Sequence, residues 1–493
     1  MMPDQAGQAQ WSRLSELVAE SMGLHFPRER WDDLRRGMAG AAQELGCEDV
    51  AACVDWLLSA PPTKAQLEVL ASHLTVGETY FFRDAQMLEA LAANILPELI
   101  GARRGREQRL RLWSAGCCSG EEAYSLAILL HRLLPDLREW HVTITATDIS
   151  ARFLQKAAAG VYGEWSFRNA PPWLKQRYCN RTPDGRYTII PEIRKMVAFA
   201  YLNLVEDVYP SLATDTNAMD VILCRNVLMY LTPPRMHKVI GKLHHALLEG
   251  GWLAVSPSEA SKAMFPQFVN VNFPGAILFR KGGTSSAPMP AFVAPAIEES
   301  LPRESPAAPV LAERAALTEE PVAAEAARGP LASAESLYRE GRYGEAADEL
   351  QAAYAEGAPE PGALSLLARA LANQGRLAEA LAWCDRWVAA DRLDPAGHYL
   401  RAIVLLERGD PVQARFSLQR AIYLHPSFVL AHFALGNLAR GGGKMDQADK
   451  HFANALDLLR EHQPDDLLPE SDGLTAGRLA EFITSLTDMG SPP

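Results

Sequence analysis

Apolar residues in the first part of the chain recur at the three- and four-residue spacing of an amphipathic helix. The pattern comprises Leu14, Leu17, Val18 and Met22, then Val54, Leu57 and Leu58, and then Leu67, Leu70 and Leu74. Pro61-Pro62 interrupts it. We therefore predict a small all-α cap over residues 9–75.

From Leu110 onward, short β-rich runs alternate with helical segments. The predicted strands cover residues 110–114, 142–147, 197–204, 221–224 and 252–255, and the predicted helices cover 121–134, 151–159 and a segment from Thr232 to Gly250-Gly251. The Thr232 hydroxyl is expected to cap that last helix. Two runs around Pro274-Gly275 predict a closing hairpin, and residues 161–196 predict a small β insertion. This alternation predicts a mainly parallel sheet with helices on both faces.

Residues 282–330 are rich in Ala, Pro, Ser and Glu and hold few large apolar side chains, which predicts a disordered linker. Beyond this segment, glycine recurs every 34 residues, at Gly341, Gly375, Gly409 and Gly443. A 34-residue helix–turn–helix period resembles the tetratricopeptide repeat. We predict an α-helical solenoid of these repeats over residues 331–460, and a capping helix and tail over 461–493.

The composition narrows the classes of partner. A formal net charge of -12 argues against nucleic acid bound by general attraction to phosphates. The seven cysteines form no CxxC pair or ligand-spaced cluster, which predicts no metal site and is typical of a reduced, cytoplasmic chain. The first residues lack the character of a signal peptide, and no apolar run is long enough to span a bilayer, so we expect no direct membrane insertion.

A glycine-bearing turn, residues 116–120, joins the first predicted strand to a helix. Its glycines allow a ligand to approach backbone amides closely, but the turn lacks the lysine of a phosphate-binding loop. Asp148 ends the next predicted strand, where a carboxylate can accept hydrogen bonds from two ribose hydroxyls. Glu121-Glu122 would suit a sulfonium or an amino group, although an acidic first turn is also ordinary helix chemistry. These residues favour a nucleoside ligand and leave an ordinary strand–helix turn open.

Four segments, read together, resemble the chemotaxis receptor methyltransferases of the CheR family. They are Thr75–Asp84, Trp113–Glu122, Asn203-Leu204 and Cys224–Tyr230, and the resemblance extends over residues 14–281. It implies a Rossmann-like methyltransferase domain over residues 76–281 of a multidomain α/β protein. It also implies that S-adenosylmethionine methylates glutamates of a methyl-accepting chemoreceptor in a chemosensory signalling pathway, with S-adenosylhomocysteine as product. Members with a repeat tail include WspC-like and Frz-type methyltransferases, so an unidentified protein partner is expected for the repeats.

The resemblance implies roles for particular residues. Arg83 and Tyr230 would lie nearest the transferring methyl group as catalytic residues. The cofactor would be bound by Thr79, Arg83, Glu122, Asp148, Asn203, Leu204, Arg225 and Asn226. Two alternatives stay open, in which Arg225 only neutralises a neighbouring carboxylate and Tyr230 only packs. Gly77 departs from the asparagine that the family often has, so no side-chain role is assigned there.

The expected chemistry needs no general base, because a glutamate side chain is ionised at neutral pH. Arg83 would hold the incoming carboxylate and Tyr230 would orient it. The basic side chains of the cap (Arg28, Arg30, Arg35 and Arg36) would either dock an acidic receptor surface or pair with neighbouring acids in solvent. The compact segment 177–199 predicts no dependence on a receptor-tail peptide.

Two other functions remain open from the sequence. One is a catalytically weak methyltransferase that acts as a signalling scaffold. The other is a methyltransferase for another protein or a small molecule, although the Asn-Pro-Pro-Tyr motif of many amino-group methyltransferases is absent from the sequence.

Overall fold

The computed structural model describes residues 5–282, 329–354 and 361–488. The predicted linker over residues 282–330 lies almost entirely outside these ranges. The N-terminal helices predicted by the apolar spacing are confirmed. They are α1 (Gln5–Met22), η1 (Arg28–Arg30), α2 (Trp31–Glu44), α3 (Val50–Ser59) and α4 (Lys64–Leu74). The cap packs around a core that includes Leu14, Leu34 and Leu70, all fully buried.

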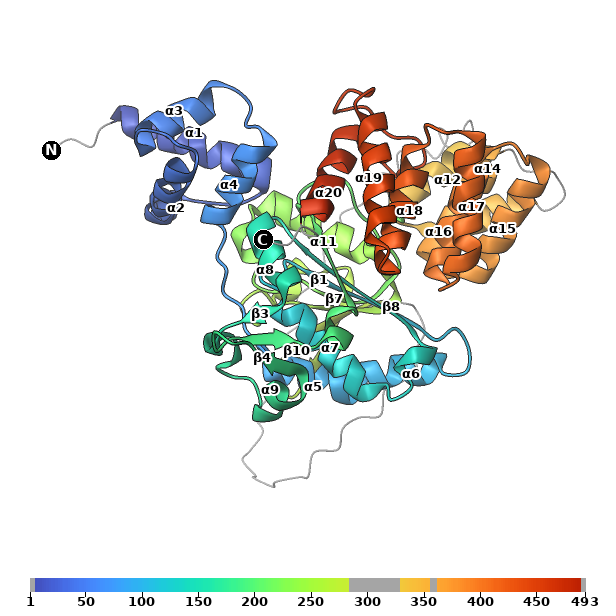
Figure 1. The fold of residues 1–493 in the computed structure, drawn as a ribbon, viewed down its shortest axis with the longest axis horizontal. Coiled ribbons are helices and arrows are strands. Elements are labelled where there is room, and N and C mark those ends of the chain that lie inside the picture. Colours follow the sequence, from blue (N-terminus) through green and yellow to red (C-terminus); the bar gives the residue numbers. More distant parts are fainter. Residues whose placement is uncertain (1–4, 283–328, 355–360, 489–493) are drawn as a thin grey trace, which may run out of the picture.

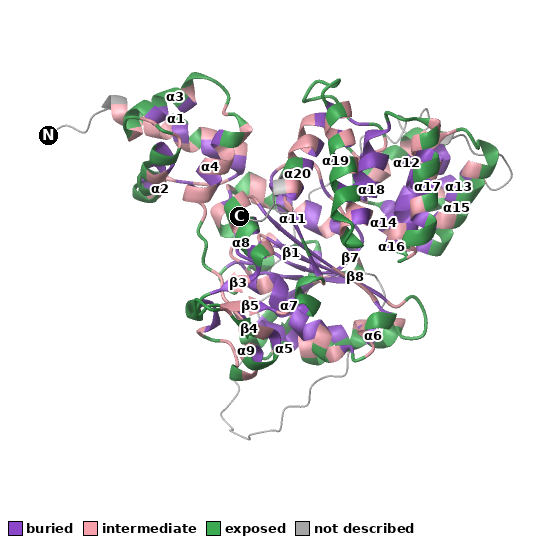
Figure 2. Cartoon of the chain, viewed as in Figure 1, coloured by how far each residue is buried: buried purple, intermediate pink, exposed green. Residues whose placement is uncertain are grey.

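A seven-stranded sheet forms the centre of the described structure, in the order β6-β2-β1-β7-β8-β10-β9. Its strands are β1 (Arg109–Ala115), β2 (His141–Asp148), β6 (Val197–Tyr201), β7 (Met219–Leu223), β8 (Leu247–Ala254), β9 (Phe268–Phe273) and β10 (Ala276–Lys281). All pairs are parallel except those made by β10, which closes the sheet as a hairpin with β9. The central strands are buried throughout (Figure 2). The predicted Rossmann-like fold class is confirmed.

Helices cover both faces of this sheet (Figure 1). They are α5 (Ala85–Ala90), η2 (Leu91–Ile95), α6 (Leu96–Arg103), α7 (Glu121–Leu133), η3 (Leu137–Glu139), α8 (Ala151–Ala159), η5 (Leu228–Tyr230), α11 (Pro233–Ala246) and η6 (Lys262–Met264). Between β2 and β6 lies a second, three-stranded antiparallel sheet in the order β3-β5-β4. The elements of this β insertion are β3 (Val161–Tyr162), η4 (Glu164–Phe167), α9 (Pro172–Tyr178), β4 (Cys179–Arg181), β5 (Tyr187–Ile189) and α10 (Pro191–Arg194).

Three local predictions need correction. Gly250-Gly251 does not end a helix, because α11 stops at Ala246 and β8 runs through both glycines. Gly250 has a φ of 79°, and the pairing of β7 with β8 shifts register between Met219 and Val221, so the glycines belong to a β-bulge. The strand predicted over 197–204 ends at Tyr201. Thr232 occupies the N-cap position of α11, but its side chain makes no capping hydrogen bond.

The C-terminal region contains the predicted helical repeats. Their helices are α12 (Pro330–Arg339), α13 (Tyr343–Ala353), α14 (Pro361–Asn373), α15 (Leu377–Ala390), α16 (Pro395–Glu407), α17 (Pro411–Leu424), α18 (Val429–Gly441) and α19 (Met445–Leu459), followed by α20 (Ala476–Asp488). The periodic glycines, Gly341, Gly375, Gly409 and Gly443, lie between paired helices with φ of 72–78°. That left-handed conformation explains the period, since glycine adopts it without steric cost.

The repeats dock on the edge of the sheet domain where β1 begins (Figure 1). The Glu407 carboxylate of α16 accepts hydrogen bonds from Arg109 Nη1 of β1 and from Asn217 Nδ2, both at 3.0 Å. Arg111 Nη1 lies 4.0 Å from the same carboxylate. All four residues are buried, and the repeat turns at Gly375 and Gly409 pack beside Arg109 and His141. Charged groups therefore form the centre of the contact between repeats and sheet.

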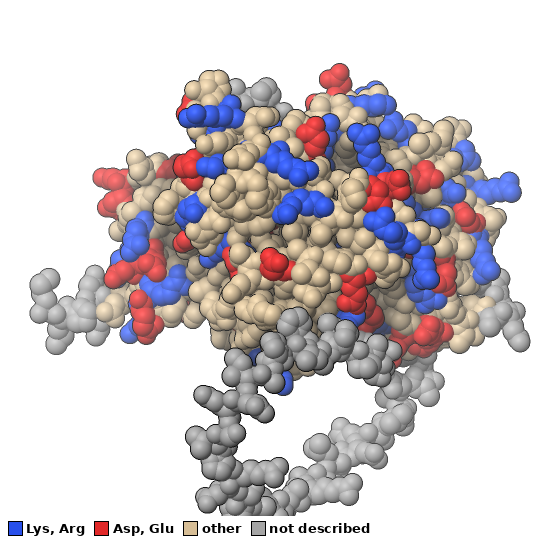
Figure 3. Space-filling model, turned by 90° about the horizontal axis from the view of Figure 1, so that it is seen from below, with Lys and Arg blue, Asp and Glu red and all other residues tan. Residues whose placement is uncertain are grey.

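The surface carries charges of both signs, and on the face shown in Figure 3 basic and acidic side chains are interspersed. Within the described ranges, no helix has both the length and the apolar character needed to cross a lipid bilayer.

Replacing Glu407 with glutamine should undock the repeats, because it leaves Arg109 and Arg111 buried without their shared carboxylate. Removing one partner of a buried ion pair costs about 3–5 kcal/mol. We expect E407Q to increase the radius of gyration in small-angle X-ray scattering and to lower the urea midpoint. The exposed Glu345 of α13, which pairs with Arg342 just before the helix, provides a control, and E345Q should match the parent in both measurements. An unchanged scattering profile for folded E407Q would contradict the role of this contact.

Candidate active site

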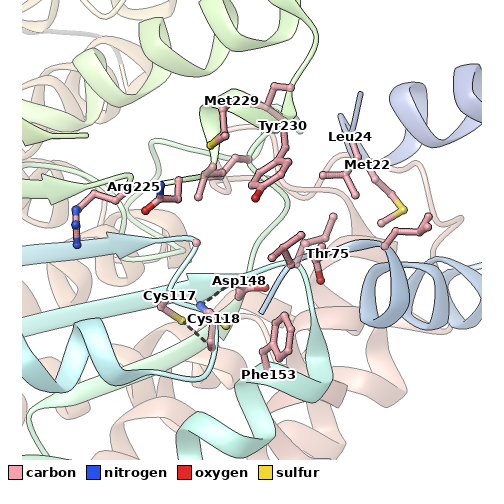
Figure 4. Close-up of a pocket in the computed structure, with 18 of the residues that line it drawn as sticks. Met22, Leu24, Thr75, Cys117, Cys118, Asp148, Phe153, Arg225, Met229 and Tyr230 are labelled. Carbon is pink, nitrogen blue, oxygen red and sulfur yellow. Dashed lines mark hydrogen bonds between the residues drawn. The ribbon is translucent and has the colours of Figure 1, made fainter. Parts of the chain in front are cut away.

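A cavity of about 330 Å³ lies between the cap and the carboxyl ends of β1, β2 and β7 (Figure 4). Its volume falls within the range of about 300–1,000 Å³ that is usual for small-molecule sites. The structure brings all nine site residues predicted from the sequence to this one cavity. These are Thr79, Arg83, Glu122, Asp148, Asn203, Leu204, Arg225, Asn226 and Tyr230.

The turn after β1 wraps around the end of β2. Gly116 has a φ of 84°, and its N–H donates to the Thr147 carbonyl at 2.8 Å. A Cβ placed on Gly116 would lie 2.4 Å from Val227, so a side chain here would collide with the opposite wall of the cavity. The glycine is therefore required both by its backbone angle and by the closeness of the next loop.

Asp148 is held by one backbone amide of this turn and one of the segment that follows β2. Its carboxylate accepts the N–H of Cys118 at 2.8 Å and that of Ser150 at 2.9 Å. Burial raises the pKa of this carboxyl above its ordinary value, while the two amides act in the opposite direction. The group is thus fixed in place, and each oxygen has a second lone pair available for hydroxyl donors from a ligand.

Arg225 neutralises two carboxylates. Its guanidinium donates to Glu122 at 3.0 Å and to Asp84 at 3.2 Å, and it also contacts the Arg83 carbonyl at 3.3 Å. In Figure 4 this guanidinium points away from Tyr230 and Asp148. The contacts support the alternative that Arg225 neutralises neighbouring acids. They also show that Arg225 ties the segment carrying Arg83 to the first turn of α7.

Glu259 does not line the cavity, but it holds a loop that does, and the sequence pattern did not indicate it. It is buried, and its carboxylate accepts the backbone N–H groups of Asn226, Val227 and Met229 at 2.8, 2.9 and 3.1 Å. Asn226 itself has a φ of 57°. A carboxylate that satisfies three amides holds the loop between β7 and η5 in this uncommon conformation. The sequence offered no local signal, because 33 residues separate Glu259 from Asn226.

The cap supplies the remaining wall of the cavity. The His25 N–H donates to the Tyr230 carbonyl at 2.6 Å, and the Arg30 guanidinium lies 5.4 Å from the centre of the Tyr230 ring. Figure 4 shows the Tyr230 ring projecting into the space above Asp148 and Thr75. Asn203 Nδ2 donates to the Ser21 carbonyl at 3.0 Å, so its amide joins the pocket loop to the end of α1. Five cap residues line the cavity although the sequence did not predict them as pocket residues, namely Met22, Leu24, His25, Phe26 and Arg30.

Comparison with known proteins matches residues 77–275 to the model of the "CheR methyltransferase, SAM binding domain". The chain is 37% identical over 218 residues to chemotaxis protein methyltransferase 1 of Pseudomonas aeruginosa, covering 43% of this chain and 77% of the relative. It is 30% identical over 250 residues to the chemotaxis protein methyltransferase of Borreliella burgdorferi, covering 50% and 87%. The chain belongs to the CheR family of chemotaxis protein methyltransferases.

Residues 337–404 and 399–464 match two models of the tetratricopeptide repeat. A match that includes both parts is the probable biofilm formation methyltransferase WspC of Pseudomonas aeruginosa. It is 29% identical over 392 residues, which cover 76% of this chain and 83% of the relative. The combination of a CheR domain with C-terminal repeats, predicted from the sequence, is confirmed.

The residues of the CheR pocket fit S-adenosylmethionine, the methyl donor that the family's binding domain indicates. Asp148 presents fixed acceptors for hydroxyl groups, and Gly116, which has no side chain, lines the cavity beside it. The two cysteines of the turn are not reactive groups, since burial raises the pKa of the Cys118 thiol to about 12 and raises that of Cys117 well above its ordinary value. Both thiols stay protonated at neutral pH, so neither provides a thiolate nucleophile.

Replacing Glu259 with glutamine should weaken cofactor binding, because an amide NH₂ would face backbone donors that now meet a carboxylate oxygen. Leaving buried donors unsatisfied costs about 1–3 kcal/mol, which corresponds to about a fivefold to 150-fold increase in Kd. Calorimetry with S-adenosylhomocysteine measures this directly. E192Q, which changes an exposed acid on α10, should bind as the parent does. Equal affinity in folded E259Q would show that the loop does not need this carboxylate.

Proposed function

We propose that this chain transfers a methyl group from S-adenosylmethionine to glutamate side chains of a chemoreceptor, forming methyl esters, while its repeats bind another protein. The observation that carries the proposal is the presence of two arginines among the residues that line the cavity. Arg30 and Arg83 line it together with Asp148, Glu122 and Tyr230, and the Arg30 guanidinium lies 5.4 Å from the centre of the Tyr230 ring. The two arginines favour an anionic acceptor, and a glutamate carboxylate is such a group.

Arg83 is available for this role. The structure gives its guanidinium a hydrogen bond to the Glu78 carbonyl and a position 5.8 Å from the centre of the Tyr80 ring. No described carboxylate lies within ion-pair distance of it, in contrast to Arg225 with its two carboxylates. An arginine that is held by a neutral carbonyl can still pair with an incoming carboxylate.

The bound cofactor supplies a methyl group already activated on a positively charged sulfur, so that transfer to a carboxylate oxygen neutralises both charges and moves no proton. The protein's task is then to align the acceptor and exclude water. Tyr230 and Arg83 line the cavity, and hydrogen bonds at His25 and Asn203 join the cap to its walls. Positioning of this kind can supply roughly 7–11 kcal/mol of the barrier.

Most of the basic side chains of the cap are already paired with acidic neighbours, so few of them are left to bind an acidic receptor surface. Arg35 pairs with Asp32, and Arg36 and Arg30 pair with Asp33, all near the start of α2. These contacts fit the alternative of a solvated, paired face for most of the basic cluster. Arg30 remains the exception, because it also reaches the cavity. We therefore place the receptor contact of the cap at Arg30.

The proposal is tested by incubating the full chain and tritiated cofactor with chemoreceptor-containing membranes. Label on a receptor band that alkali releases as volatile methanol is expected for a methyl ester. Glutamate-to-glutamine substitution at the labelled receptor positions should remove it. Cofactor binding without receptor label would favour a scaffold, and alkali-stable label would point to a different acceptor group.

Replacing Tyr230 with phenylalanine should lower turnover by about tenfold to hundredfold, because the hydroxyl that faces the cavity is lost and a hydrogen bond to a charged group contributes about 1.5–3 kcal/mol. The Kd for S-adenosylhomocysteine should stay within about twofold, since the ring remains. Methanol release per receptor measures the first quantity and calorimetry the second. Y423F, at an exposed tyrosine of the repeats, is the matched control. Full turnover in Y230F would leave Tyr230 a packing role only.

Replacing Arg83 with alanine should have a larger effect on kcat/KM than Y230F, because both a charge and its hydrogen bonds are removed. The expected loss is at least about 3 kcal/mol, or more than hundredfold. Single-turnover methyl transfer at saturating cofactor isolates this loss from any change in cofactor affinity. Normal turnover in a folded R83A protein would contradict the proposed carboxylate contact.

A further inference from the structure

The chain segment between α19 and α20 forms a closed loop against the repeats. The Leu468 N–H donates to the Leu474 carbonyl at 3.0 Å, and Leu467 forms an isolated antiparallel bridge with Thr475. Leu468 and Leu474 are buried in the apolar core of the repeats. The tip of this loop, Pro469–Gly473, is therefore held on both sides by a buried leucine. It carries two acidic side chains, Glu470 and Asp472.

Both acids meet one buried arginine of the repeats. The Arg369 guanidinium of α14 forms ion pairs with Glu470 through Nη2 and with Asp472 through Nη1. Ser365 and Tyr338 add hydroxyl contacts to the two carboxylates, each at 3.4 Å. These side chains come from α12 and α14, which contact each other, and α16 packs beside α14. We call this surface the α12–α14–α16 face.

The described residues of α12 to α19 offer Arg369 no carboxylate. Among the described residues of α12 to α19, its guanidinium has one polar side-chain partner, the Ser365 hydroxyl at 3.3 Å. A buried guanidinium without an anion is unfavourable, so this face needs carboxylates that come from outside the repeats. Asn373, one helical turn further along α14, donates to the Tyr338 hydroxyl at 2.9 Å, and its buried Oδ1 accepts nothing among the described residues. Such an acceptor suits a backbone N–H of a bound chain.

The loop that now supplies the anions does so in uncommon backbone conformations. Glu470 and Asp472 have φ of 65° and 55°, values that cost free energy for residues with a side chain. A peptide that presents the same two carboxylates from an extended backbone avoids this cost. A cavity of about 180 Å³ also borders the loop, lined in part by Phe428, Leu458 and Leu468, and can take an apolar side chain.

We propose that the α12–α14–α16 face is a binding site for an acidic peptide of a partner protein, with two carboxylates spaced like Glu470 and Asp472, and that the chain's own loop occupies this site in competition. The proposal does not rest on the identity of the methyl acceptor. Each carboxylate of the incoming peptide replaces one of the loop's ion pairs to Arg369.

Displacement of the loop reaches the CheR pocket through α20, which follows it directly and lies between the repeats and the sheet domain (Figure 1). Arg478 of α20 pairs with Glu206 at 2.5 Å, and the same carboxylate oxygen accepts from Asn203 Nδ2 of the pocket wall at 3.1 Å. Ser211 Oγ donates to the Ser471 carbonyl of the loop at 3.4 Å. When the loop leaves, these supports of the pocket wall are released together.

The test measures fluorescence anisotropy of a labelled synthetic peptide with the sequence of residues 465–476, added to the full chain. In the parent protein the loop competes for the site. In the E470Q/D472N protein the loop has lost its anions, so the peptide should bind at least tenfold more tightly. The same peptide carrying both amide substitutions should not bind. D446N/D449N removes the same charge from exposed positions of α19 that do not line the cavity beside the loop, and should behave as the parent does.

Equal binding of the acidic and amide peptides, or absence of tighter binding to E470Q/D472N, would overturn the proposal. Adding R369Q to the double variant should abolish binding. If that triple variant does not fold, Y338F in the double variant replaces it, with an expected several-fold loss of affinity. Amide hydrogen exchange in parent protein should become faster in α20 when peptide is added. Peptide binding with unchanged exchange over residues 466–488 would mean that loop and peptide bind side by side, which also contradicts competition.

Discussion

Strand β1 pairs in parallel with β2 on one side and with β7 on the other. Its carboxyl end leads into the pocket and its amino end contacts the repeats. At its carboxyl end, Ala115 leads into the turn at Gly116 that surrounds Asp148. At its amino end, Arg109 and Arg111 project into the contact with the repeats. Parallel pairing places the carboxyl ends of neighbouring strands at one edge, and ligands of open α/β sheets bind there. The same pairing leaves the opposite edge free to receive the repeats, so one seven-residue strand separates the pocket from the docking contact.

Docking of the repeats at the amino end of β1 buries the charged residues that lie there. The amino ends of β1 and β7 carry charged residues that are all paired. Arg109 pairs with Glu407 of the repeats, and Arg111 pairs with Asp215 of the loop before β7. Asp220 pairs with Arg103 of α6. Buried ion pairs add little net stability over apolar packing, but they tolerate no mismatch. The repeats are therefore held in one register on the sheet. A buried arginine has a similar role beside the pocket. Arg225 pairs with both Glu122 and Asp84, and thereby orders the segment that carries Arg83.

Features with a local cause were predictable from the sequence. The turn at Gly116, the strand end at Asp148 and the 34-residue glycine period all depend on backbone conformations that neighbouring residues specify. Features that depend on distant pairs were not: Glu259 under the Asn226 loop, Arg30 over Tyr230, and Glu407 beside Arg109, which is 298 residues away in the chain. Gly250 is a case in which the local sequence allows two structures and a distant contact selects one. A left-handed glycine ends a helix or forms a bulge equally well, and only the pairing of β8 with β7 decides between them.

Helix α20 contacts both the N-terminal cap and the loop that forms part of the pocket wall. Lys64 of the cap donates to the Glu481 carbonyl of α20 at 3.3 Å, while Arg478 on the preceding turn of the same helix pairs with Glu206. Burial raises the pKa of Glu206 to about 7, because desolvation outweighs the effect of Arg478. A carboxyl whose folded pKa is raised stabilises the folded state below its unfolded pKa, and this contribution is lost as the pH rises towards 7. Glu206 therefore changes its charge close to neutral pH, and this carboxylate is the one that pairs with Arg478 where α20 meets the pocket wall. The ion pair between α20 and the pocket wall is thus weaker below neutral pH, where the carboxyl is protonated.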